Sequence, residues 1–133
     1  MRLRGTAAAI LTAGLAAGCG TIEKDKQALS LQAATAGYQS ALRWGYYETA
    51  VGYLHPDQRQ SQPAPSLTGI RVTGYDVVQP PIVREPGVAT QIVAIEYLHE
   101  DRQVIERLTD RQTWRWDDNL QNWQLRSGLP GFR

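Results

Sequence analysis

Residues Gln103–Trp116 read QVIERLTDRQTWRW, and this stretch decides the fold. Side chains of two kinds alternate along it, which is typical of a strand whose two faces meet different surroundings. We therefore expect one face to be solvated and the other to lie on the core of an antiparallel sheet. The solvated phase would contain Arg107, Thr109, Arg111, Thr113 and Arg115, and the core phase Val104, Leu108, Trp114 and Trp116.

Three polar residues interrupt the core phase of this strand: Glu106, Asp110 and Gln112. A fully packed face would not hold two carboxylates without partners. Either part of this face is open as a pocket, or a bulge changes the register, or these positions lie at an edge near solvent. A pocket lined by Tyr38, Glu106, Asp110 and Trp114, with Tyr46 or Tyr97 nearby, could support acid–base chemistry.

Three further strands surround this one in the sequence. The first begins at Ile70, slips phase at Gly74 and is interrupted by Pro80-Pro81, which suggests a bulge or an edge strand. The turn composition of residues 84–87 precedes a second strand, residues 88–98, and a fourth strand is expected at 122–127. Residues 128–131 are rich in glycine and proline and predict a loose tail.

Two helices precede the strands. Apolar residues recur at intervals of three and four over residues 25–44 and again over 46–54, which predicts a long helix and a short one. Residues 57–69 have the composition of a loop after Pro56 ends the second helix. Helices followed by strands indicate an α+β domain, with an N-terminal helix pair packed on a curved antiparallel meander of about four strands.

The first twenty residues read MRLRGTAAAILTAGLAAGCG and have the layout of a secretory signal. Arg2 and Arg4 form a positive start, and residues 5–17 form an apolar run that is too short to span a bilayer. The only cysteine of the chain, Cys19, follows this run directly.

Residues 15–19, LAAGC, resemble the lipobox of bacterial lipoproteins, although alanine stands at position 16, where that family prefers leucine. The resemblance implies that Cys19 is lipidated with diacylglycerol, that cleavage occurs before it, and that an N-acyl chain is added. Gly20 in place of aspartate implies sorting to the outer membrane, on its periplasmic face. Three segments follow from this: a signal peptide (1–18), a lipidated cysteine with a tether (19–26) and one α+β domain (27–133).

The composition excludes several classes of function. Without Arg2 and Arg4, the 14 basic residues fall to 12 against 13 acidic ones, so a basic footprint for nucleic acid is missing. His55 and His99 are at no metal-ligand spacing, and we expect neither a metal nor a cofactor apart from the lipid. The four tryptophans are expected mainly in the core.

The mature region is similar to the cystatin-like, cone-shaped folds of the nuclear-transport-factor-2-like superfamily. The similarity lies in residues 38–50, YQSALRWGYYETA, and in the pair TWRW (113–116) and NWQL (122–125). It implies a curved sheet wrapped around a helix, sometimes with a pocket. The superfamily includes isomerases, dehydratases and noncatalytic modules, but its catalytic Asp–His arrangements match no pair in this chain.

Two functions of different classes follow. The first is a lipid-anchored envelope lipoprotein whose domain binds or scaffolds a protein partner, or dimerises through its open sheet face. The alternative is a small-molecule-binding enzyme of the isomerase or dehydratase type that uses the carboxylates. An enzyme requires an acid or base with a perturbed pKa in a pocket, whereas a binding module requires an exposed apolar or aromatic patch.

Overall fold

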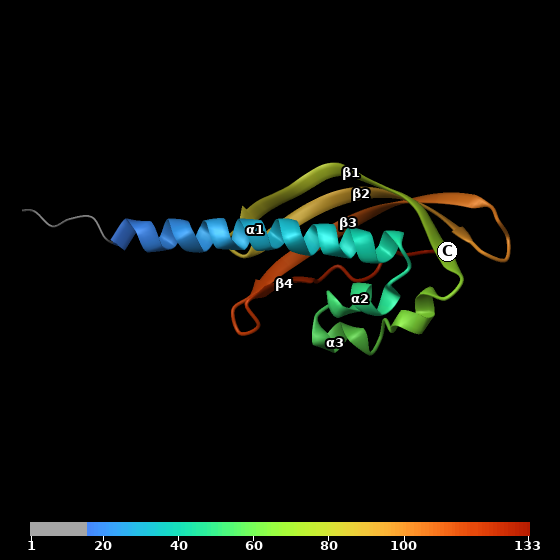
Figure 1. Cartoon of the computed structure of the whole chain (residues 1–133), viewed down its shortest axis with the longest axis horizontal. Helices are drawn as coiled ribbons and strands as arrows, with labels where there is room; N and C mark the ends of the chain where they lie inside the picture. Colours follow the sequence, from blue (N-terminus) through green and yellow to red (C-terminus); the bar gives the residue numbers. More distant parts are fainter. Residues whose placement is uncertain (1–15) are drawn as a thin grey trace, which may run out of the picture.

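The computed structural model describes residues 16–133, with side chains from residue 20 onward. Figure 1 shows a long helix lying along a curved four-stranded sheet, and this arrangement confirms the α+β prediction. The strands follow one another in the order β1-β2-β3-β4, each antiparallel to the next. The elements are α1 (Ala16–Arg43), α2 (Tyr47–Gly52), α3 (Pro56–Arg59), the 3-10 helix η1 (Ala64–Leu67), β1 (Ile70–Glu85), β2 (Val88–His99), β3 (Ile105–Asp117) and β4 (Asn122–Leu125).

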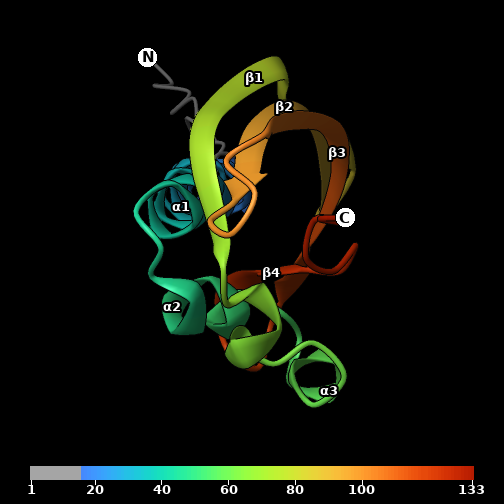
Figure 2. The ribbon, with the colours of Figure 1, turned by 90° about the vertical axis from the view of Figure 1, so that its right-hand side faces the viewer.

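The core lies between α1 and the concave face of the sheet. Figure 2 shows the sheet curving from β1 over β2 and β3 down to β4, with α1 on the side that the curve encloses. Buried residues of α1 and of the strands form one apolar cluster there, which includes Tyr38, Leu42, Val93, Trp114 and Leu125. Burial of this apolar surface supplies the main driving force for folding.

The pairing of β2 with β3 is regular over eleven residue pairs, from Val88 opposite Arg115 to Leu98 opposite Ile105. The bulge that could have explained the polar residues of β3 is therefore absent from this ladder. Burial alternates along β3 as predicted, although Val104 precedes the strand and is exposed instead of lying on the core face.

Strand β1 is long and irregular. Its register with β2 shifts between Val72 and Gly74, as the phase slip predicts, and shifts three more times before Glu85. Pro80 and Pro81 lie within this strand, which continues through Ile82 and Val83 at the edge of the sheet, as the edge-strand prediction expects. β1 is an edge strand, where a proline without an N–H group is tolerated. Side chains cap part of this edge: Tyr47 Oη donates to the Ile70 carbonyl, and Arg43 Nη1 donates to the Val72 carbonyl at 3.0 Å.

Helix α1 begins nine residues before the predicted start at Asp25. Residues 19–26, predicted to be a tether, are therefore helical and continuous with the part of α1 that packs on the sheet. The sequence does not predict this part of the helix, because residues 20–26 are exposed and therefore show no apolar repeat with a period of 3.6 residues. Residues 1–15, and with them most of the predicted signal peptide, lie outside the described part of the chain.

The segment predicted as a loop at residues 57–69 contains α3 and η1. Pro56 occupies the first turn of α3 instead of ending α2. Proline is favoured there because the first N–H groups of a helix have no partner within the helix. The glutamines, serines and prolines of this segment predict a loop. The two helices have only four residues each, which is too short for an apolar repeat to reveal them.

The C-terminal tail is packed, which corrects the prediction that residues 128–131 are loose. Leu129 N–H donates to Gln62 Oε1 at 2.7 Å, and the Phe132 ring contacts the Tyr97 ring at a centroid distance of 4.8 Å. Arg133 N–H donates to Tyr97 Oη at 3.1 Å. The packing partners lie more than 30 residues away in the sequence, so local composition does not reveal them.

Candidate functional site

Cys19 and Gly20 lie near the start of α1. The side chain of Cys19 is outside the described side chains, and Gly20 is exposed with open space around its Cα. Lipidation of Cys19 and sorting by Gly20 remain predictions. Within residues 16–133, no helix has the length and apolar character needed to cross a bilayer.

A cluster of polar side chains lies in the core, centred on Gln112. Its Nε2 donates to Tyr75 Oη and to Asp110 Oδ2, both at 2.9 Å. Its Oε1 accepts from Gln91 Nε2 at 2.8 Å and from Trp114 Nε1 at 3.1 Å. Both donors and both acceptor positions of this amide are therefore used. We call these five residues, with Tyr38, the inner polar cluster.

Burial shifts the acidity of the groups in the inner polar cluster. Desolvation raises the pKa of Asp110, and the hydrogen bond from Gln112 offsets part of this rise. Desolvation raises the pKa of Tyr75 to about 12. The pKa of Tyr38 lies well above its usual value, first because of burial and then because the Asp110 and Tyr75 charges lie nearby. Burial therefore disfavours the charged form of all three groups.

Tyr38 is fully buried, and its hydroxyl has no hydrogen-bond partner among the described residues. Its ring packs edge-on against Trp114 at 5.6 Å and against Tyr53 at 6.0 Å between centroids. Tyr53 in turn contacts Trp114 at 6.1 Å, so the three rings form a closed set of T-shaped contacts. This geometry is favourable for aromatic pairs.

The structure brings together three of the four predicted pocket residues: Tyr38, Asp110 and Trp114. Glu106 is separate from them. It lies opposite Tyr97 in the ladder and is half-buried, four residues and about 13 Å along the strand from Asp110. Two carboxylates therefore do not face one site. Gln91 and Tyr75 belong to the cluster but were missed; Gln91 could have been found as a polar residue between Ala89 and Val93 in one strand phase.

The outer face of β3 carries the predicted row of exposed arginines. Arg107 Nη2 lies 3.2 Å from Glu96 Oε2 and forms a cross-strand ion pair with it. Such an exposed pair contributes little to stability. Arg111 and Arg115 form no ion pair with any residue in the described part of the chain.

The connection between α1 and α2 carries exposed aromatic rings, which corrects the expectation that Trp44 lies in the core. Trp44 is 66% exposed and Tyr46 is 64% exposed. The Arg43 guanidinium lies 4.9 Å from the centroid of the Trp44 ring. Beside them, an indentation of about 480 Å³ reaches to Arg71 and Glu100. We call Trp44 and Tyr46 the aromatic end.

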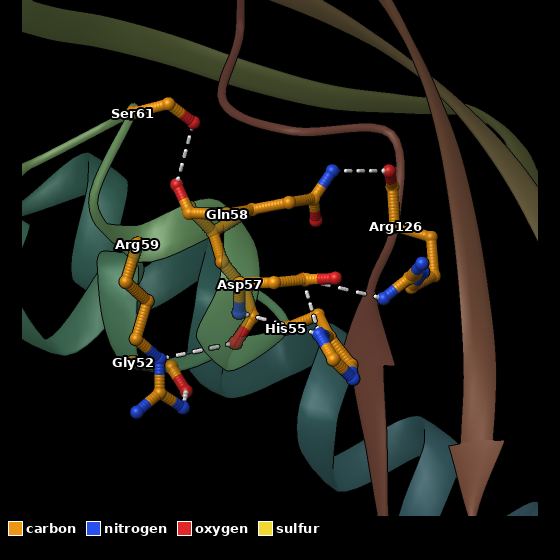
Figure 3. A network of polar contacts seen from close by, with 8 residues as sticks. Gly52, His55, Asp57, Gln58, Arg59, Ser61 and Arg126 are labelled. Carbon is orange, nitrogen blue, oxygen red and sulfur yellow. Dashed lines mark hydrogen bonds and ion pairs between the residues drawn. The ribbon is translucent and has the colours of Figure 1, made fainter.

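A second polar network holds α3 against the segment that follows β4 (Figure 3). Gln58 Nε2 donates to the Arg126 carbonyl at 2.9 Å, and Arg126 Nη1 lies 3.7 Å from Asp57 Oδ1. His55 Nδ1 contacts the Asp57 carboxylate and accepts from the Asp57 N–H, which caps α3. Arg59 donates to the carbonyl groups of Gly52 and Leu54. The partners are mostly main-chain groups, so this network has a structural role.

No group of three histidine, cysteine or acidic side chains placed to hold a metal ion occurs within the described residues. No family model matches the chain, and no curated protein matches it significantly. The geometry of the site therefore carries the functional argument.

Proposed function

We propose that this protein is a lipid-anchored lipoprotein of the bacterial outer membrane, facing the periplasm, whose domain binds a protein partner of the cell envelope. The anchor is the acylated Cys19. The binding surface is the aromatic end. In this proposal the domain holds its partner without catalysing a reaction.

One observation supports this proposal most directly: the helix that contains Cys19 ends at the aromatic end. Helix α1 runs without interruption from Ala16 to Arg43. At 1.5 Å per residue, about 36 Å of helix separates Cys19 from Arg43. Figure 1 shows α1 extending beyond the sheet on the N-terminal side, with the domain at its other end. An anchor at Cys19 would thus present Trp44 and Tyr46 away from the membrane.

The aromatic end has the properties of an interface centre. Tryptophan, tyrosine and arginine are the residues that most often dominate binding energies at protein interfaces. Here Trp44 and Tyr46 are exposed on either side of Gly45, and Arg43 stacks on Trp44 and is held by its hydrogen bond to the Val72 carbonyl. This hydrogen bond orders the guanidinium before a partner arrives, which reduces the entropy cost of binding.

The test uses the whole precursor in its native envelope. We expect palmitate to label the wild type and not Cys19→Ser, and Gly20→Asp to move the protein to the inner membrane in an enterobacterial-type sorting system.

We expect crosslinked pull-down to recover a specific protein with the wild type and to lose it in Trp44→Ala/Tyr46→Ala. Leu120→Ala, a change at an exposed residue of the β3–β4 turn, is the matched control. Equal labelling of Cys19→Ser, or equal recovery by the double variant, would contradict the proposal.

The enzyme alternative rests on Asp110 beside Tyr38 and Tyr75. A carboxyl group with a raised pKa near two hydroxyls is a combination found in acid–base catalysts. In this core, however, Gln112 Nε2 donates one hydrogen bond to Asp110 and one to Tyr75. If Asp110→Asn recovers the partner as well as the wild type does, the result agrees with the binding function. If the wild type converts a substrate and Asp110→Asn does not, the result favours the enzyme alternative.

A further inference from the structure

A groove runs between α1, α2 and β4, with a volume of about 530 Å³. We call it the α1–β4 groove. Figure 1 shows α2 and β4 beside α1, on the side where the groove lies. Small residues open it: Ala33 and Ala34 on α1 and Gly52 on α2 leave space that larger side chains would fill. The volume falls within the range of small-molecule sites in proteins.

The lining of the α1–β4 groove is uncharged and combines apolar surface with a few polar side chains. None of the described residues that line it is acidic, basic or histidine. Two hydroxyls and two amides lie around it, together with two aromatic rings. These six side chains are Ser30, Thr49, Asn122, Gln124, Tyr53 and Trp123.

We propose that the α1–β4 groove binds an uncharged saccharide. A charged ligand would lose its hydration without meeting an opposite charge. A purely apolar ligand would leave the hydroxyls and amides of the groove without partners. A saccharide offers hydroxyl oxygens to these groups, and its C–H faces can pack on the half-buried ring of Tyr53.

An extended peptide fits the groove less well, because the outer edge of β4 is already paired at one end. β3 pairs with one edge of β4, and on the other edge Leu125 N–H donates to the Tyr53 carbonyl at 2.7 Å. Leu54 also forms a bridge with Leu125. A peptide strand added along the whole of β4 would have to displace this contact.

The test measures binding of named oligosaccharides to the full chain in a detergent without sugar groups. Chitotetraose and cellotetraose are the neutral probes, tetragalacturonate is the charged probe, and an uncharged capped tetra-alanine is the peptide probe. We expect calorimetry and saturation-transfer NMR to show binding of a neutral saccharide only. Ala33→Phe should fill the groove and weaken binding at least about tenfold, which is about 1.4 kcal/mol. Gln32→Phe, a change at the neighbouring exposed position outside the groove, should not.

Three results would overturn the saccharide site. These are the absence of neutral saccharide binding at millimolar concentration, tighter binding of the charged or peptide probe, and binding that Ala33→Phe does not affect. Thr49→Val, which removes one exposed hydroxyl without touching the core, provides a second variant and should weaken binding severalfold. Trp44→Ala/Tyr46→Ala should retain saccharide binding, so failure of the partner site and failure of this site are separable.

Discussion

At the scale of single residues, the buried hydroxyl of Tyr38 and the buried carboxylate of Asp110 each lower the free energy of unfolding. The ring of Tyr38 contributes to the aromatic packing, but its hydroxyl has no described partner. Asp110 is buried with one hydrogen bond from Gln112. Each cost can be measured by a substitution that removes one functional group and preserves the volume.

Replacing Tyr38 by phenylalanine should raise the free energy of unfolding by about 1 kcal/mol, because it removes a buried hydroxyl that makes no hydrogen bond. Tyr75→Phe is the matched variant: it removes a hydroxyl that accepts from Gln112, and it should lower the free energy of unfolding by a similar amount. Urea unfolding measures both. A loss of stability in Tyr38→Phe as large as that in Tyr75→Phe would show that the Tyr38 hydroxyl is satisfied.

Replacing Asp110 by asparagine should stabilise the protein at pH 7, and the gain should shrink as the pH falls. Burial raises the folded-state pKa of Asp110 above that of the unfolded chain. The folded state therefore binds this proton more tightly, and the wild type gains stability relative to the variant on acidification through the raised pKa. Asparagine keeps an oxygen for Gln112 without the charge. Urea unfolding of both proteins between pH 7 and pH 4 gives the difference; a constant difference would contradict a raised pKa.

At the scale of elements, the structure differs most from the sequence-based prediction at the start of α1 and in residues 128–133. The alternation along β3 predicts its two faces, because each strand residue meets its surroundings independently. The start of α1 and the packing of residues 128–133 were not predictable in this way. The first protrudes without an apolar face, and the second depends on contacts between Phe132 and Tyr97, 35 residues apart.

The same contrast applies to the candidate site. The phase of β3 identifies Asp110 and Trp114 as core-facing, and the structure places them together. The phase of β3 could not separate Glu106 from Asp110 and Trp114, because phase gives the face on which a residue lies and not its position along the core. Nor could the phase of β3 show that Trp44 is exposed, since Trp44 lies outside that strand, directly after the last residue of α1.

The tail should contribute measurably to stability. Phe132→Ala should lower the free energy of unfolding by about 1–3 kcal/mol, less than the 3–5 kcal/mol typical of a fully buried phenylalanine, because the ring is half-buried. Arg133→Ala is the control: the hydrogen bonds of this residue to Tyr97 use its main-chain N–H and carbonyl groups, so the change should have little effect. Equal stability of the two variants in urea unfolding would mean that the tail does not pack in solution.

At the scale of the whole molecule, α1 fixes the distance between the proposed anchor and the domain. Lys24→Pro should kink or break α1 and so shorten the distance between Cys19 and the domain, because proline removes a main-chain donor and clashes with the preceding turn. Lys24 lies ahead of Leu31, the first buried apolar residue of α1, so the core should remain folded. Neutron reflectometry of the lipoprotein on a supported bilayer should show a thinner protein layer for Lys24→Pro than for Lys24→Ala. Equal layers would show that α1 does not act as a rigid spacer.

The continuity of α1 also has a mechanical consequence. If Cys19 is held in a membrane while a partner pulls on the aromatic end, one point of loading lies near the start of α1 and the other directly after its last residue. Tension then runs along the helix axis from Cys19 to Trp44 and does not cross the hydrogen-bond ladders of the sheet. The strands and the α1–β4 groove would experience only the sideways resistance of the helix against them. Such a domain can transmit force between a membrane and its partner while the sheet stays unloaded.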